Sequence, residues 1–281
     1  MLLTMISKDS RKVVGEYVFL SKYSQTHNGV KETWDEAVNR VMTMHWNRYK
    51  EIVNEADMPE FERLFGFAKK LYHQQHILGA QRALQYGGEL MLEKHARFYN
   101  CSSTYIDRVE VFEEIMYLLL CGAGTGYSVQ HIHTEQLPIP KGFNPKLEKK
   151  IFVIPDTIEG WAKAAGELIG AYYYGRAEVL FDYSQIRPKG AYIRGGFRAP
   201  GPEPLREALD KVRSLLCKVQ KRKLRPFELH YIICVLANSV VTGGVRRSAM
   251  ISIFDADDVE MAGCKVGAWI STHPELCRSS G

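Results

Sequence analysis

The chain has 281 residues, of which 46% are hydrophobic and 25% charged, and its formal net charge at pH 7 is +5. This composition is typical of a globular protein with one large domain or two ordinary ones. No apolar run approaches the ~20 residues that span a bilayer, and the N-terminus lacks the order of a signal peptide. We therefore expect a cytoplasmic protein with no membrane partner. The basic runs 146–150 and 218–225 are typical of solvated faces, so no nucleic-acid partner is expected either.

The first hundred residues have helical patterns. Thr33 to Glu36 has the form of a capping box, and the apolar residues that follow keep helical spacing. Residues 58–75 form a second amphipathic stretch, and residues 89–97 form a third after Gly87 and Gly88.

From residue 99 onward the character changes to alternating strands and helices. Strands are predicted at 99–106, 127–132, 178–182 and 250–254, and helices at 111–121, 156–172, 205–219 and 226–241. Residues 134–155 hold four prolines and much charge, and are predicted to form a loop. This order predicts an α/β fold with a largely parallel sheet.

A glycine-rich turn follows the helix that ends at Cys121, in the order Gly122-Ala123-Gly124-Thr125-Gly126. In dinucleotide-binding loops the glycines follow a strand and open a helix, so this turn is not such a fingerprint. It would let a ligand approach backbone amides. The alternative is a plain helix C-cap with a tight turn.

Two basic loops are candidates for nucleotide contacts. Arg187 to Arg198 is punctuated by glycines, and Gly243 to Ser248 combines two glycines with two arginines just before an apolar strand. Arginine forks suit phosphates. On the residues alone, a surface hairpin with solvated arginines explains the second loop equally well.

The six cysteines are scattered, without a CxxC or Cys/His cluster, so no metal site is predicted. They should be thiols that are either buried or chemically used.

Several stretches together resemble the catalytic subunit of ribonucleotide reductase, with the nearest likeness to the adenosylcobalamin-dependent (class II) enzymes. They follow the order of that family: residues 32–38, 100–101, 121–129, 156–161, 182–191, 201–205 and 243–249. A class I enzyme, which depends on a metal-cofactor subunit, is the alternative within the family.

The resemblance implies a helical domain at 1–98, followed at 99–281 by the first half of a ten-stranded α/β barrel. It implies an oxidoreductase of deoxyribonucleotide biosynthesis, the process that provides the deoxyribonucleotides for DNA replication. In this family a thiyl radical acts on a ribonucleotide, diphosphate or triphosphate, and two further cysteines supply the reducing equivalents. Adenosylcobalamin as cofactor and a thioredoxin-like reductant as partner are implied with it.

The resemblance also assigns site residues. Cys101 corresponds to one of the two reducing thiols, which must close a disulfide; otherwise it is a buried strand cysteine. Asn100 and Ser102 would lie near the substrate, although the family usually has a bulkier residue than Ser102. Gly122, Gly124 and Gly126 would line the substrate.

The two basic loops correspond to the family's allosteric loops, which bind a deoxynucleotide or ATP effector. The first would use Arg187, Lys189 and Arg194. The second would use Gly243, Gly244, Arg246, Arg247 and Ser248, and would link effector to substrate choice.

The family's radical cysteine, in an Asn-x-Cys-x-Glu setting, has no counterpart in the chain. We therefore expect an N-terminal fragment that does not reduce ribonucleotides alone and needs a complementary C-terminal half. The alternatives are a catalytically inactive module for nucleotide binding or assembly, and an unrelated α/β binding domain. Residues 134–155 show no clear sign of the inserted segment of some class II enzymes, which favours a homodimer built on the helix from Asp156.

Overall fold

The computed structural model describes residues 8–27, 29–193, 197–219, 222–241 and 249–280. The chain divides into two compact units, Met1–Tyr99 and Asn100–Gly281.

The first unit is mainly helical, as predicted. Its elements are α1 (Lys8–Lys22), β1 (Thr26–His27), β2 (Val30–Lys31), α2 (Trp34–Tyr49), α3 (Met58–His73), α4 (Gln81–Tyr86), α5 (Glu89–Glu93) and the 3-10 helix η1 (His95–Phe98). The predicted capping box is confirmed, because the Thr33 side chain accepts from the Glu36 amide while the Glu36 carboxylate accepts from the Thr33 amide. The short β1–β2 hairpin was not predicted.

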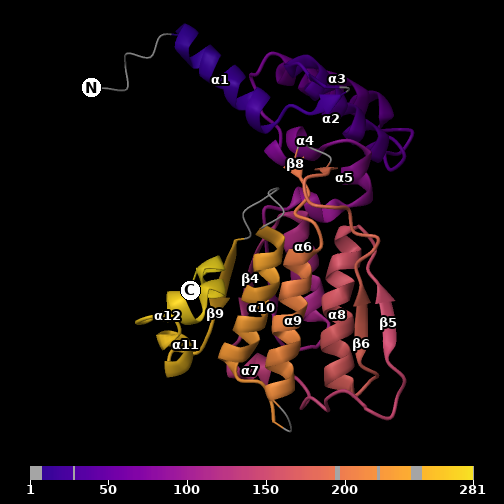
Figure 1. Cartoon of the computed structure of the whole chain (residues 1–281). Helices are drawn as coiled ribbons and strands as arrows, with labels where there is room; N and C mark the ends of the chain where they lie inside the picture. The colour runs from indigo at the N-terminus through magenta and orange to yellow at the C-terminus, as the bar shows by residue number, and fades with distance from the viewer. Residues whose placement is uncertain (1–7, 28, 194–196, 220–221, 242–248, 281) are drawn as a thin grey trace. The chain divides into compact units, whose positions relative to one another are not determined.

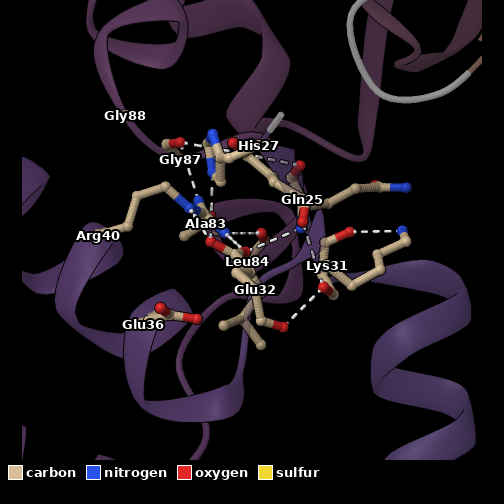
Figure 2. A network of polar contacts seen from close by, with 12 residues as sticks. Gln25, His27, Lys31, Glu32, Glu36, Arg40, Ala83, Leu84, Gly87 and Gly88 are labelled. Atoms are coloured by element: carbon tan, nitrogen blue, oxygen red, sulfur yellow. Dashed lines mark hydrogen bonds and ion pairs between the residues drawn. The ribbon is translucent and has the colours of Figure 1, made fainter. Parts of the chain in front are cut away.

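A buried ion pair organises this unit (Figure 2). Glu32 is only 5% exposed and binds the Arg40 guanidinium from α2. Arg40 also donates to the carbonyl oxygen of Leu84 at 2.7 Å and to that of Gly87 at 2.9 Å. The carbonyls at the end of a helix have no partner within it, so Arg40 satisfies the C-terminal end of α4 while it neutralises Glu32.

The second unit alternates strands and helices. Its elements are β3 (Cys101–Tyr105), α6 (Val111–Cys121), β4 (Gly124–Ser128), α7 (His131–Thr134), β5 (Lys150–Val153), α8 (Ile158–Tyr174), β6 (Val179–Asp182), β7 (Tyr192–Ile193), β8 (Phe197–Arg198), α9 (Glu203–Lys218), α10 (Pro226–Val241), β9 (Met250–Ile253), α11 (Val259–Gly263), α12 (Trp269–Thr272), the 3-10 helix η2 (Pro274–Arg278) and β10 (Ser279–Ser280).

Four of these strands form one parallel sheet in the order β10-β9-β4-β3. Tyr127 of β4 and Met250 of β9 lie on one face of it and belong to the same buried cluster as the apolar residues of α6 and α10. The long helices α6, α8, α9 and α10 run side by side in this unit (Figure 1). The sheet is thus packed against helices on the face that bears Tyr127.

The other face of the sheet is open. Side chains alternate between faces along a strand, and most of those on this face are exposed: Cys101 is exposed, Tyr105 is 55% exposed, and Ile251 and Ile253 of β9 are 53% and 50% exposed. Ser128, at the end of β4, is the exception and is buried. Gly124 and Gly126 are the β4 residues in register with Cys101 and Ser103, so β4 adds no side chain of its own to this face there.

Two strand predictions differ from the structure. β4 begins at Gly124 rather than at Tyr127, because a glycine strand can still form a complete ladder of backbone hydrogen bonds with its neighbours. β5 lies within the predicted loop 134–155, and it pairs with β6 in a separate two-stranded parallel sheet.

Candidate functional site

Three segments that are distant in sequence meet at the edge where the parallel strands begin. The Gly124 amide donates to the Asn100 carbonyl at 2.8 Å, and the Thr125 amide donates to the Ala249 carbonyl at 2.9 Å. The start of β3, the start of β4 and the residue just before β9 are therefore joined by backbone hydrogen bonds. Residues 242–248, which carry the predicted second loop, lead directly into this edge but lie outside the described residues.

Cys101 is the first residue of β3 and its side chain is exposed. Its register partner is Gly124, so no neighbouring side chain on β4 covers the thiol. The sequence left open whether Cys101 is buried; the structure shows that it is accessible from the open face.

Gly126 has a packing reason to be glycine. A Cβ at this position would lie 3.1 Å from Cγ2 of Ile251, whereas one at Gly124 would meet nothing closer than 3.5 Å. Gly122 has a different role: with φ at +82° it ends α6 in the left-handed region, the C-cap conformation that glycine adopts at no steric cost. The helix-cap alternative is therefore correct for Gly122, while Gly124 and Gly126 lie within the strand.

Ser102 points to the other face. Its hydroxyl lies 3.1 Å from Oγ1 of Thr125 and donates to the Gly124 carbonyl at 3.2 Å. This hydroxyl ties β3 to β4 from the helix side, so Ser102 and Cys101 do not share a face. A substrate role for Ser102 stays a prediction.

A buried polar chain under the sheet was missed from the sequence. The Tyr127 hydroxyl lies 2.8 Å from Nδ1 of His230 on α10, and Nε2 of His230 lies 3.6 Å from Sγ of Cys234. Burial, with Lys265 nearby, lowers the pKa of His230 to about 4, and burial raises the pKa of Tyr127 well above its ordinary value. His230 and Cys234 are four residues apart in a predicted helix, and this spacing was the only indication in the sequence that they lie together. Their contact with Tyr127 of β4 depends on the tertiary fold and was not predictable.

The residues predicted to bind an effector are only partly described. Arg187 forms an ion pair with Asp156, which directly precedes the Thr157 cap of α8. Lys189 is exposed, and its amide nitrogen lies so near Gly201 that a Cβ there would be 3.0 Å away. Arg194, Gly243, Gly244, Arg246, Arg247 and Ser248 lie outside the described residues, so their placement stays a prediction.

The fold is α/β with a parallel sheet, and an exposed thiol lies beside the glycine-containing strand β4. Comparisons with known proteins identify proteins that are similar to this chain. Residues 140–216 match the family "B12-dependent ribonucleotide reductase, insertion domain". The adenosylcobalamin-dependent ribonucleoside-triphosphate reductase of Euglena gracilis is 27% identical over 90% of this chain and 36% of its own length. The enzyme of the same name from Lacticaseibacillus paracasei is 38% identical over 37% of this chain and 15% of its own.

A solved structure agrees with these relatives. The crystal structure of a B12-dependent (class II) ribonucleotide reductase matches 94% of this chain and 44% of its own chain, with a TM-score of 0.74 at 20% identity. The resemblance predicted from the sequence motifs is thus confirmed: the chain resembles the B12-dependent ribonucleotide reductases over nearly its whole length. It spans about a third of the length of curated relatives such as the Euglena enzyme.

The family match also revises one expectation. No inserted segment was evident at 134–155, yet the insertion-domain match begins at residue 140 and runs through β5, α8, β6 and most of α9. The matched segment could not be recognised as an irregular loop, because it consists of regular helices and strands. The homodimer expectation rested on that apparent absence and loses its basis.

Proposed function

We propose that this chain carries part of the substrate site of a B12-dependent ribonucleotide reductase, with Cys101 as one of its two reducing thiols. The exposed thiol at the start of β3, in register with Gly124, which adds no side chain of its own beside the sulfur, supports this most directly. A sugar can approach a sulfur atom closely only where no side chain intervenes. The ten-stranded barrel, of which the β10-β9-β4-β3 sheet would be one part, belongs to this proposal.

The chemistry requires two thiols that act as a pair. Replacement of the ribose 2′-hydroxyl by hydrogen consumes two electrons and two protons, releases water, and leaves the two sulfurs joined as a disulfide. A dithiol reductant of the thioredoxin type then reduces that disulfide by thiol–disulfide exchange. The proposal places the second reducing thiol and the radical-forming cysteine in a complementary C-terminal half.

Adenosylcobalamin would supply the radical in the complete enzyme. Two cavities among the described residues have volumes of about 320 and 250 Å³. Pockets of 300–1,000 Å³ hold drug-sized ligands, and a corrin cofactor is larger, so neither cavity fits it.

Protection of Cys101 from alkylation tests the site. Cys101 and Cys217 are both exposed, whereas Cys121 and Cys234 are buried. In native protein, iodoacetamide should label Cys101 and Cys217, and a ribonucleoside triphosphate should slow labelling of Cys101 several-fold without affecting Cys217. Equal labelling rates at Cys101 with and without nucleotide, followed by peptide mass spectrometry, would contradict the proposal.

The effector loops need a separate test. The proposal predicts that labelled dATP or dTTP binds the chain and that Arg246→Ala weakens this binding, since an arginine fork on a phosphate contributes on the order of 1.5–3 kcal/mol. An unrelated α/β binding domain would show neither result. Ribonucleotide reduction after mixing with a C-terminal half would separate a reductase part from an inactive nucleotide-binding module.

A further inference from the structure

A groove of about 250 Å³ lies between α9 and α10, which run side by side (Figure 1). Its lining comes from the second half of α9, the first half of α10 and His273. The described residues of this lining include none from the candidate substrate edge and none from the two basic loops. The groove is therefore a different feature from the site that carries the proposed function.

One part of the groove is aromatic. The ring of His273 lies 5.7 Å from that of Phe227 and 5.4 Å from that of Tyr231, centroid to centroid, and meets both edge to face. All three rings are partly buried, and the partly buried Leu215 of α9 adds to the same lining. Such a surface suits the flat apolar body of a small ligand.

The carboxylates at the groove are already paired. Glu228 is only 4% exposed, and it accepts hydrogen bonds from Arg222 and Arg225. Glu275 forms an ion pair with Lys211. The described residues of the lining therefore offer a ligand no unpaired negative charge.

Three hydrogen-bond donors in the same lining have no partner within the described part of the chain: the Lys218 ammonium, the Ser214 hydroxyl and the Tyr231 hydroxyl. Burial, with Glu275 nearby, raises the pKa of Tyr231, so its hydroxyl stays protonated and can donate. Lys218 lies in the last turn of α9, where a cation stabilises the helix in any case. Lys218 alone would thus indicate nothing, but three free donors beside an aromatic surface indicate a ligand that accepts hydrogen bonds.

We propose that this groove binds a small monocarboxylate with an aromatic body. The ligand ring packs against Phe227 and Tyr231, and the carboxylate accepts from Lys218 and from the hydroxyls of Ser214 and Tyr231. One unpaired cation balances one negative charge, which favours a carboxylate over a phosphate dianion. Since pockets of about 300–1,000 Å³ hold drug-sized ligands, the groove restricts the ligand to a smaller molecule.

Titration of the full chain with phenylacetate, followed by saturation-transfer NMR, tests the inference. Phenylacetate should bind at millimolar concentration. Phenylacetamide has the same shape without the charge and should bind about fivefold more weakly, the size expected for loss of one solvent-exposed ion pair. Acetate, which lacks the ring, should not displace phenylacetate at equal concentration. No binding of phenylacetate, equal affinity for the acid and the amide, or displacement by acetate would each overturn the inference.

Matched variants locate the ligand. Lys218→Gln should weaken phenylacetate about fivefold and remove its advantage over the amide. Lys163→Gln is the control, because Lys163 is a half-exposed lysine of α8 outside the described lining, and it should change neither affinity. Tyr231→Phe keeps the ring but removes the donor, and should weaken phenylacetate about threefold.

Two results with the variants would refute the site. One is an unchanged affinity for phenylacetate in both Lys218→Gln and Tyr231→Phe, with circular dichroism as a check that each variant is folded. The other is an affinity that falls as the protein concentration is raised, which would assign the groove to a second copy of the chain instead.

Discussion

At the scale of single residues, the structure explains why a short motif contains a glycine, which the sequence could not reveal. Gly160 belongs to one of the stretches that carry the family resemblance, and it lies in the first turn of α8. A Cβ there would lie 2.3 Å from the Pro155 carbonyl oxygen and 2.9 Å from Cδ of the Pro155 ring. The motif is thus constrained by close packing of the chain before α8, and its glycine needs no ligand to explain it.

Gly160→Ala should therefore destabilise α8 by about 2–3 kcal/mol, because the backbone carbonyl of Pro155 cannot move away freely. Gly170→Ala in the same helix is the control: its Cβ would meet nothing closer than 3.9 Å. Alanine should there stabilise the helix by about 0.5–1 kcal/mol. Hydrogen exchange of the α8 amides measures both effects, and equal protection in the two variants would contradict the packing argument.

The buried Tyr127–His230 pair predicts an acid-sensitive core. Burial lowers the pKa of His230 to about 4 in the folded protein, against about 6.5 when unfolded. The unfolded state thus binds the extra proton first, and stability falls as pH drops from about 6.5 to about 4. The loss should reach about 3 kcal/mol.

Urea titrations of the second unit between pH 7 and pH 4 measure this loss. His230→Gln should lower stability at pH 7, because the Tyr127 hydroxyl loses its ring partner. The variant should also lose the fall in stability that the wild type shows between about pH 6.5 and about pH 4. An unchanged slope with pH in the variant would show that other groups control acid unfolding.

At the scale of elements, apolar periodicity predicted most of the helices. α3 (Met58–His73), α6 (Val111–Cys121), α8 (Ile158–Tyr174) and α10 (Pro226–Val241) lie where the patterns placed them. The two misplaced strands, β4 and β5, share one cause. The pleated strand β4 starts with Gly-Thr-Gly, and β5 follows a proline-rich, charged stretch, so local propensity argued against both. Their strand pairing is decided by neighbours that are distant in sequence.

The buried Glu32–Arg40 pair should contribute strongly to the stability of the first unit. Arg40→Met leaves the Glu32 carboxylate buried without its cation and removes the donors to the Leu84 and Gly87 carbonyls. The expected loss is about 3–5 kcal/mol. Arg63→Met is the control, since Arg63 pairs with Glu60 on the surface of α3, and such pairs contribute at most about 1 kcal/mol.

The double variant Glu32→Gln/Arg40→Met completes the comparison. It should be more stable than Arg40→Met alone, because no unpaired charge stays buried. Chemical unfolding of the wild type, Glu32→Gln, Arg40→Met and the double variant gives the coupling energy, and a double variant no better than Arg40→Met would mean that the carbonyl contacts dominate.

At the scale of the whole molecule, each compact unit has a hydrophobic cluster of its own. One cluster draws on residues 19–91 and the other on residues 106–276. The described helices include none long and apolar enough to cross a bilayer. The α/β class and the family resemblance were predictable from ordered motifs. The open face of the sheet was not, because it depends on which strands align and on what packs behind them.

Separate clusters predict separable effects of core substitutions. Met91 and Leu168 are each fully buried, one in each cluster. Met91→Ala should lower hydrogen-exchange protection only in residues 8–99, and Leu168→Ala only in residues 100–280, each by about 2–5 kcal/mol. Equal loss of protection in both units from either substitution would contradict this independence.

The order of the strands also sets the order in which the sheet can form. β3 and β4 are close in sequence and can pair soon after α6 forms, but the next neighbour of β4 is β9, which follows α8, β6, α9 and α10 along the chain. Pairings of such high contact order form slowly. During synthesis the Thr125 amide therefore has no partner until the Ala249 carbonyl is in place. The edge of β4 stays exposed until then, and chains with an exposed strand edge are prone to aggregate. The end of the sheet that carries Cys101 is therefore among the last parts of this protein to form. The yield of folded protein in expression should depend on chaperones and on temperature more than the stability of the folded state does.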